Sequence, residues 1–435
     1  MSRPARRRAS EEPRAPNRAR ARASSACPGT RGSGICSTLL APGRSGRTAG
    51  TARRGIVGRP GGGCGEEAGE VLEFLEASPL VDHHCHGVLD RGLGREAFEE
   101  SLTEAETTGP PGVSMFDTQV GFALRRWCPP VLDLDAHAEP DAYLARRAEL
   151  GAAEVNRRFL GAAGLAALCV DTGYRPRALL GPPELGRLAG AHAHEIVRLE
   201  TVAEQVAAQG VDAARFADEV RSRLDARDAV GAKSIAAYRA GLELSGERPA
   251  AAEVAAAAGR LMRQEAPRVR DEVLHRFLVF CAVDAGLPVQ FHVGYGDVDA
   301  DLRRGDPLLL IELLRAMDPV PAMLLHNYPF HRHAGYLAQV LPNVYVDAGL
   351  ATHNLGHRAP ALIAELLELA PFGKVLYSSD AFALAELYHL GALLFRHGLA
   401  GFLARGVDDG AWTAGDAERV AGLIASGNAR RVYGI

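Results

Sequence analysis

The stretch LVDHHCHGVL, residues 80–89, decides how the rest of the sequence is interpreted. Leu80 and Val81 lead directly into a polar run, which predicts a buried strand that ends in imidazoles. Successive side chains of a strand alternate between its two faces, so His84 and His86 should share one face. Two neutral imidazoles on one face are suited to binding a divalent metal ion, although two surface histidines near a loop would give the same spacing.

Seven further apolar runs along the chain also end in polar residues that could do chemistry. These runs close on Asp171, Glu200, Lys233, His292, His326, Asp347 and Asp380. The connections between the runs are long enough for helices, and alternating strand and helix patterns predict a parallel sheet. Eight such units predict an α/β fold of the (β/α)8 TIM-barrel type, with active residues at the carboxyl ends of the strands. An open doubly wound sheet is the competing fold, but the residues after His86 do not form the glycine-rich phosphate loop that it would need.

The chain divides into a head rich in Arg, Ala and Gly and a long apolar body. Residues 1–66 hold almost no large apolar side chains, so we expect a disordered tail there. Residues 67–435 are expected to form the barrel domain. A helical insertion at about residues 87–162, after the first strand, is too long for an ordinary connection and is typical of a lid or binding element.

Charge and composition argue against several classes of partner. The net charge is -4, but residues 1–60 carry fourteen Arg and only two acids, so the head is +12 and the remainder is -16. An acidic body disfavours nucleic acid as the partner, and no run of about 18 uncharged apolar residues exists to span a membrane. The seven cysteines show no CxxC spacing, which favours a reducing, cytoplasmic compartment. We therefore expect a small-molecule substrate, and a homo-oligomer is compatible with such a barrel.

Closing the barrel would bring residues far apart in the sequence to one rim. His84, His86, His292, His326 and Asp380 would share a pocket there. A carboxylate buried without a partner costs several kcal/mol, so Asp380 should face a cation. Three or four nitrogen and oxygen ligands with a position left for water is the catalytic pattern of zinc, and Mn2+, Fe2+ or Ni2+ would also accept it. Asp380 could then take a proton from the water, and His326 could polarise a substrate carbonyl.

Four other charged residues near strand ends are weaker candidates. Lys233 could bind a substrate carboxylate through a buried stem, and Arg239 in the segment AYR could clamp one. Arg198 and Glu200 alternate onto one face of their strand and could bind substrate, but an ion pair between them is the simpler expectation.

The whole set of residues resembles the amidohydrolase superfamily, specifically the amidohydrolase-related (type 2) family. The DxHxH motif is present as Asp82, His84 and His86, and the single histidines and the aspartate follow at the expected strands. The similarity covers roughly residues 68–435 and includes GAKSIAAYRAGL, FHVGYGDVD, HNYPFHRHAGYLAQVLPNVYVDAGL and LYSSDAFALAELYHLGA. These segments resemble the amidohydrolase-like domain that is fused to glutamine synthetase in plant nodulin-like and fungal sporulation proteins.

The resemblance implies a metal-dependent hydrolase that uses a metal-activated water on a C-N bond, amide or related, of a small molecule. It implies His84, His86, His292 and Asp380 as the ligands of a divalent metal, most simply Zn2+, and His326 and Asp380 as catalytic residues. Some superfamily members carboxylate a lysine of the fourth strand to bridge two metals, so Lys233 could instead be a second-metal ligand. Two alternatives remain: a decarboxylase or sugar-acid isomerase on the same ligands, and a catalytically inactive binding or scaffold barrel.

Overall fold

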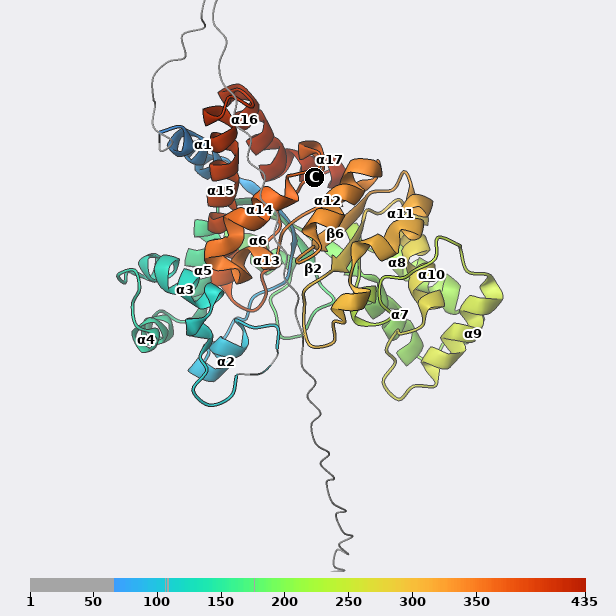
Figure 1. Cartoon of the computed structure of the whole chain (residues 1–435). Helices are drawn as coiled ribbons and strands as arrows, with labels where there is room; N and C mark the ends of the chain where they lie inside the picture. The colour runs from blue at the N-terminus through green and yellow to red at the C-terminus, as the bar shows by residue number, and fades with distance from the viewer. Residues whose placement is uncertain (1–65, 106, 108, 176) are drawn as a thin grey trace, which may run out of the picture. The chain divides into compact units, whose positions relative to one another are not determined.

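The computed structural model describes residues 66–435 except residues 106, 108 and 176. Seven parallel strands are hydrogen-bonded to one another in sequence order, and helices surround the sheet (Figure 1). The strands are β1 (Leu80–Cys85), β2 (Leu165–Asp171), β3 (His192–Arg198), β4 (Ala229–Ser234), β5 (Val289–Val293), β6 (Ala322–His326) and β7 (Val344–Val346). Because every pair is parallel, all seven carboxyl ends lie at one rim.

The segment of residues 375–380 closes the sheet between β7 and β1. Val375 forms a parallel bridge with Val346 of β7. On the other side, the backbone N–H of His83 in β1 donates to the carbonyl oxygen of Tyr377 at 3.1 Å. The eighth apolar run therefore occupies the eighth position of the barrel, and the predicted TIM-barrel fold is confirmed.

Apolar side chains form two layers, one inside the barrel and one between the sheet and the helices. Alternate residues of each strand point to opposite faces, which is why buried parallel strands are apolar on both faces. Tyr433 packs against the inner layer from the end of the chain. The strand residues of that layer are Val81, Ala167, Cys169, Ile196, Met323, Leu325 and Leu376.

Helices follow most of the strands and cover the outer layer. Figure 1 shows α2, α3 and α4 together on one side of the barrel and α8, α9 and α10 on the opposite side. The helices are α1 (Glu66–Ala77), α2 (Arg95–Glu100), α3 (Gln119–Trp127), α4 (Pro140–Leu150), α5 (Ala152–Ala163), α6 (Pro182–Ala189), α7 (Leu199–Ala208), α8 (Phe216–Asp225), α9 (Ala251–Met262), α10 (Glu272–Asp284), α11 (Ile311–Met317), α12 (His331–Val340), α13 (Ala351–Asn354), α14 (Ala359–Leu366), α15 (Ala385–Asp408), α16 (Ala414–Gly422) and α17 (Asn428–Tyr433).

The insertion expected after the first strand is helical. Helices α2 to α5 lie between β1 and β2, over the range 87–162 and one residue beyond it. The tail expected over residues 1–66 lies outside the described residues, apart from Glu66, at which α1 begins.

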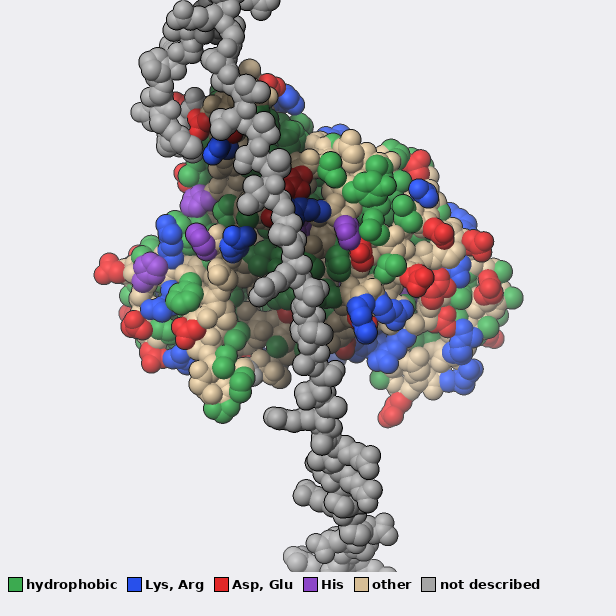
Figure 2. Space-filling model, viewed as in Figure 1, with side chains coloured by type: hydrophobic (Ala, Val, Ile, Leu, Met, Phe, Trp, Pro, Cys, Tyr) green, Lys and Arg blue, Asp and Glu red, His purple; other side chains and the backbone are tan. Residues whose placement is uncertain are grey.

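Within the described part of the chain, no helix combines the length and the apolar character needed to cross a bilayer. The four cysteines of this part are free and buried. Figure 2 shows acidic and basic side chains next to one another on the side formed by α9 to α11, where Arg248 pairs with Asp284 at 2.7 Å. Exposed pairs of this kind contribute little to stability.

A buried ion pair connects the insertion to α15. Glu386, in the first turn of α15, is fully buried, and its Oε1 lies 2.5 Å from Nε of Arg147 in α4. The hydroxyl of Tyr143, also in α4, donates to the same oxygen at 2.8 Å. A charge in the interior is tolerated only while its counter-charge is in place, so this pair holds the insertion against the barrel.

We expect Glu386→Leu to lower the free energy of unfolding by about 3–5 kcal/mol, because it leaves the Arg147 guanidinium in the interior without a counter-charge. Tyr143→Phe is the matched control: it keeps the ion pair and should cost about 1–2 kcal/mol. Urea unfolding followed by circular dichroism measures both variants. Equal losses in the two would contradict the role given to the ion pair.

Candidate metal centre

Two candidate residues lie on backbone that non-glycine residues rarely adopt. His326, the last residue of β6, has a φ of 67°, and Asp380 has a φ of 50°. The backbone N–H of His326 donates to Oδ1 of Asp347 at 2.7 Å, and that of Asp380 donates to the carbonyl oxygen of His84 at 3.0 Å. These hydrogen bonds hold both side chains at the carboxyl rim in spite of the strain.

His84, His86 and Asp380 form one cluster at this rim. Oδ1 of Asp380 lies 3.0 Å from Nε2 of His84 and 3.2 Å from Nε2 of His86. One ligand atom from each residue lies within 4.8 Å of the other two, and all three side chains are buried. Two imidazoles and a carboxylate are ligands that divalent transition metals accept.

Gln290 of β5 determines which nitrogen of His84 carries the proton. The side-chain amide of Gln290 donates to the carbonyl oxygen of His83 at 2.7 Å, so its Oε1 faces Nδ1 of His84, 2.8 Å away. Nδ1 of His84 is therefore the donor, and Nε2 has a lone pair. Burial, with a contribution from Lys233, lowers the pKa of His84 to about 4, so this imidazole is neutral at pH 7.

Lone pairs consequently face one another at the centre of the cluster. Nδ1 of His86 lies 3.3 Å from the carbonyl oxygen of Asp171, which leaves Nε2 of His86 as an acceptor as well. Burial alone would raise the pKa of Asp380. The nearby histidines, of which His326 has the largest effect, lower that pKa by more than burial raises it, so the pKa of Asp380 is well below its ordinary value. Oδ1 of the ionised Asp380 accepts no hydrogen bond within the described residues. Three acceptors directed at one point repel one another unless a cation lies between them, so the residues fit a divalent metal ion.

His326 lies against the cluster without a hydrogen bond. Its Nδ1 is 3.4 Å from Oδ2 of Asp380, and neither ring nitrogen has a hydrogen-bond partner among the described residues. Burial lowers the pKa of His326 well below its usual value, so the ring is neutral. A neutral imidazole at this rim can donate one N–H to a substrate oxygen.

His292 lies beside the cluster and not in it. Its Nδ1 is 3.2 Å from the hydroxyl of Tyr238, and its Nε2 is 3.1 Å from the carbonyl oxygen of Tyr295. A carbonyl can only accept, so Nε2 carries the proton and Nδ1 accepts from Tyr238. Its ring centroid is 4.5 Å from that of His326. Ligation by either nitrogen of His292 would need the contact of that nitrogen to break, and its role as a metal ligand stays a prediction.

Lys233 and Arg239 both reach the region of the cluster from the β4 side. The side chain of Lys233 is buried, and its Nζ lies 3.4 Å from Nε2 of His84. Burial lowers the pKa of Lys233 to about 8. Arg239 lines the same pocket as Lys233. The structure therefore brings both residues to the site, and their roles toward substrate or a second metal stay predictions.

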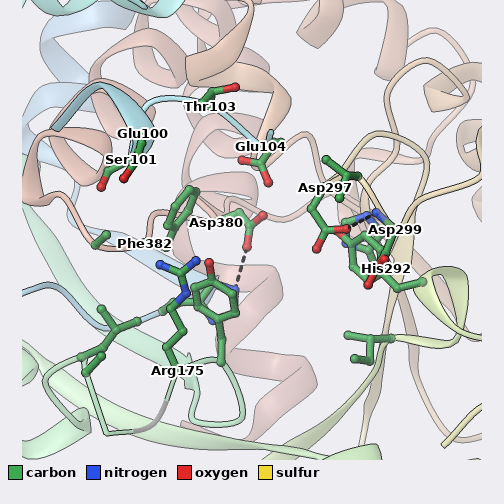
Figure 3. Close-up of a pocket in the computed structure, with 18 of the residues that line it drawn as sticks. Glu100, Ser101, Thr103, Glu104, Arg175, His292, Asp297, Asp299, Asp380 and Phe382 are labelled. Atoms are coloured by element: carbon green, nitrogen blue, oxygen red, sulfur yellow. Dashed lines mark hydrogen bonds and ion pairs between the residues drawn. The ribbon is translucent and has the colours of Figure 1, made fainter. Parts of the chain in front are cut away.

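A pocket of about 410 Å³ opens over the cluster. Figure 3 shows Asp380 with Glu104 of the insertion on one side and Arg175, from the loop after β2, on the other. Asp297 lies near His292 in the same view (Figure 3). A pocket of this volume suits a small molecule, and the insertion supplies part of its wall.

Two residues that hold the histidines were missed from the sequence. Gln290 had a signal, because it is a polar residue within the apolar run LPVQFHV, two positions before His292, and so shares its face of β5. Tyr238 had none, because it comes from the short 3-10 helix of residues Ala236–Tyr238 after β4, whose course the sequence does not indicate.

The expected ion pair between Arg198 and Glu200 is wrong. Nη2 of Arg198 lies 2.6 Å from Oδ2 of Asp171, on the neighbouring strand β2. Glu200, the second residue of α7, accepts instead from the hydroxyl of Ser234 at 2.8 Å and from the backbone N–H of Ile235 at 2.9 Å. The strand β3 ends at Arg198, so the two residues do not share a strand face.

We expect Gln290→Leu to weaken binding of a divalent metal by about 10- to 100-fold, because it removes the acceptor that keeps the lone pair of His84 on Nε2. Competition with a chromophoric chelator measures the dissociation constant. Tyr433→Phe is the control, because it removes a different partner of the Gln290 amide and leaves the bond to His84 intact. Equal affinity of Gln290→Leu and the parent would contradict this role of Gln290.

Comparison with known proteins places the chain in a family. A family model described as amidohydrolase matches residues 133–435. Protein fluG of Emericella nidulans is 26% identical over 410 residues, which cover 83% of this chain and 46% of that protein. The chain thus spans about half the length of this curated relative.

Solved structures share the fold. A Lactobacillus casei structure described as a metal-dependent hydrolase has a TM-score of 0.74 at 30% identity, with 84% of this chain and 97% of that chain covered. A uronate isomerase of Thermotoga maritima has a TM-score of 0.58 at 12% identity and covers 85% of this chain and 97% of its own. A glucuronate isomerase of Caulobacter crescentus has a TM-score of 0.57 at 16% identity, with coverage of 86% and 95%. The resemblance found in the sequence is confirmed, and the chain belongs to the amidohydrolase family.

Proposed function

We propose that the protein is a metal-dependent hydrolase that adds water to a C-N bond, amide or related, of a small molecule. The observation that carries this proposal is the set of three acceptors, from His84, His86 and Asp380, that face one point. Such a set needs a divalent cation, and family membership agrees with that need. A catalytically inactive scaffold barrel would have no use for this arrangement.

A divalent ion bound there supplies Lewis acidity and makes water a stronger nucleophile at neutral pH. The residues of the chain supply the rest. Oδ2 of Asp380, turned away from the two cluster imidazoles toward His326, can accept a proton from water and return it to the leaving nitrogen. The N–H of neutral His326 can donate to the substrate carbonyl oxygen as negative charge develops on it.

We propose one metal ion, most simply Zn2+, held by the three cluster residues. Mn2+, Fe2+ or Ni2+ would suit the same ligands, and supply in the cell decides between them. Lys233 is the residue that could bring in a second ion if its amine were carboxylated. Without that modification its ammonium group has no lone pair to offer a second ion.

An isomerase that acts on a sugar acid is the competing function on the same residues. Its support is the fold shared with the uronate and glucuronate isomerases, which is weaker than the family match. The two functions differ in product: hydrolysis releases an amine or ammonia, whereas isomerisation releases nothing. Product analysis by mass spectrometry therefore separates them.

Metal content is the first test of the proposal. Plasma mass spectrometry on the purified protein should find about one equivalent of transition metal, lost in His84→Ala and Asp380→Asn. About two equivalents would assign Lys233 to a second site. No metal in the parent, even after supplementation, would contradict the hydrolase and leave the scaffold barrel.

We expect His326→Ala to lower kcat on an amide substrate by about 100- to 1000-fold, because it removes the donor to the developing oxyanion. Metal content should stay at the parent value, since His326 is not a cluster ligand. His333→Ala, at an exposed histidine in α12, is the matched control and should leave kcat unchanged. Loss of metal in His326→Ala would show that His326 is a ligand.

A further inference from the structure

Two of the arginines that line the pocket are already neutralised by the protein. Arg198 is paired with Asp171 at 2.6 Å, and Arg268 is paired closely with Asp299. Arg239 is different. Its Nη1 lies 4.0 Å from Oδ2 of Asp299, the limit of an ion pair, and that carboxylate is already engaged by Arg268.

The guanidinium of Arg239 also lacks hydrogen bonds. Its Nε and Nη1 are buried, and no described residue accepts a hydrogen bond from either atom. Its side chain is only 13% exposed, so water reaches little of it. Buried donors that are left unsatisfied are costly, which makes this site a receptor for an acceptor that a ligand would bring.

The segment that carries Arg239 is held in place before any ligand arrives. Glu200 accepts from the Ser234 hydroxyl at 2.8 Å and from the N–H of Ile235 at 2.9 Å, which anchors the turn after β4. The N–H of Arg239 donates to the carbonyl oxygen of Ala236 at 2.9 Å. A preorganised donor loses little entropy on binding, so the arrangement favours affinity.

We propose that Arg239 is the carboxylate-binding residue of the pocket and that the substrate is a small carboxylic acid with its reacting bond at Asp380 and His326. This rests on the proposed function for the reaction, but the binding itself does not depend on it. The pocket that Arg239 lines also contains Asp380 and His326, so one small ligand can reach both ends.

The charges around the pocket favour a carboxylate over a phosphate. Glu104, Asp297 and Asp299 also line it and are labelled in Figure 3. These three acids oppose a dianion more than a monoanion. A planar carboxylate also matches the fork of a guanidinium with two parallel N–H donors.

Calorimetric titration tests the proposal, with the monoanion pentanoate as the probe and its neutral analogue pentanamide as the comparison. The full chain is used as purified and again after treatment with a chelator, because a carboxylate could also bind a metal directly. We expect pentanoate to bind in both preparations, at least about 10-fold more tightly than pentanamide. Arg239→Gln should weaken pentanoate binding by about 10- to 100-fold, and Arg239→Lys, which keeps the charge without the fork, by less.

Two further variants sharpen this result. Arg187→Gln makes the same change in charge at an exposed residue of α6, outside the pocket, and should leave affinity unchanged. Asp299→Asn removes the carboxylate 4.0 Å from Arg239 and should tighten pentanoate binding. Thermal unfolding confirms that each variant is folded.

Three outcomes would overturn the proposal: no saturable pentanoate binding by the parent, equal binding by the parent and Arg239→Gln, or binding that the chelator abolishes while Arg239→Gln retains it. The last outcome would assign the carboxylate to the metal. None of these readings needs turnover, so a failed hydrolase assay leaves the test of the carboxylate site intact.

Discussion

An ionised carboxylate that faces the lone pairs of two imidazoles is unstable in a protein interior unless a cation lies among them. Asp380, His84 and His86 are in this position, and one potential metal-ligand atom from each residue lies within 4.8 Å of the other two. Each imidazole keeps its orientation because its Nδ1, the nitrogen that does not face the cluster, has an acceptor as partner. Gln290 holds Nδ1 of His84, and the carbonyl oxygen of Asp171 lies next to Nδ1 of His86. The barrel thus stores an unfavourable arrangement that binding of a metal ion would relieve.

The backbone around the site is shaped by the same requirement. A residue at a strand end would normally continue the strand direction, but His326 and Asp380 turn into the left-handed region and so direct their side chains over the rim. Asp347 makes one of these turns tolerable, because its Oδ1 accepts the N–H of His326 and its Oδ2 lies 2.7 Å from Nε2 of His83. One buried carboxylate therefore ties β7 to β1 and to the end of β6.

Strand ends were predictable from the sequence, whereas contacts between strands were not. Apolar runs that stop at His84, His326 and Asp380 mark where strands leave the core, and parallel pairing then brings them to one rim. The orientation of His292 depends on the carbonyl oxygen of Tyr295, which no pattern of residue types records. The ion-pair partner of a side chain depends in the same way on strand register and on where each strand ends, as Arg198 and its partner Asp171 show.

The buried aspartates around the barrel show why Asp380 is the exceptional one. Asp171 is neutralised by the guanidinium of Arg198. Asp347 accepts backbone N–H groups and a histidine, which together lower its pKa against the effect of burial. Asp82 accepts from the hydroxyl and the backbone N–H of Ser379, but burial raises its pKa to about 7, so it can carry a proton. Asp380 pairs with no guanidinium among the described residues, and Nε2 of His84 and Nε2 of His86, which lie next to its Oδ1, are acceptors. The ammonium group of Lys233 lies 3.4 Å from Nε2 of His84 but forms no ion pair with Asp380. A metal ion among these ligand atoms would balance the charge of Asp380 directly, which is why chemistry is expected at this aspartate and not at the other three.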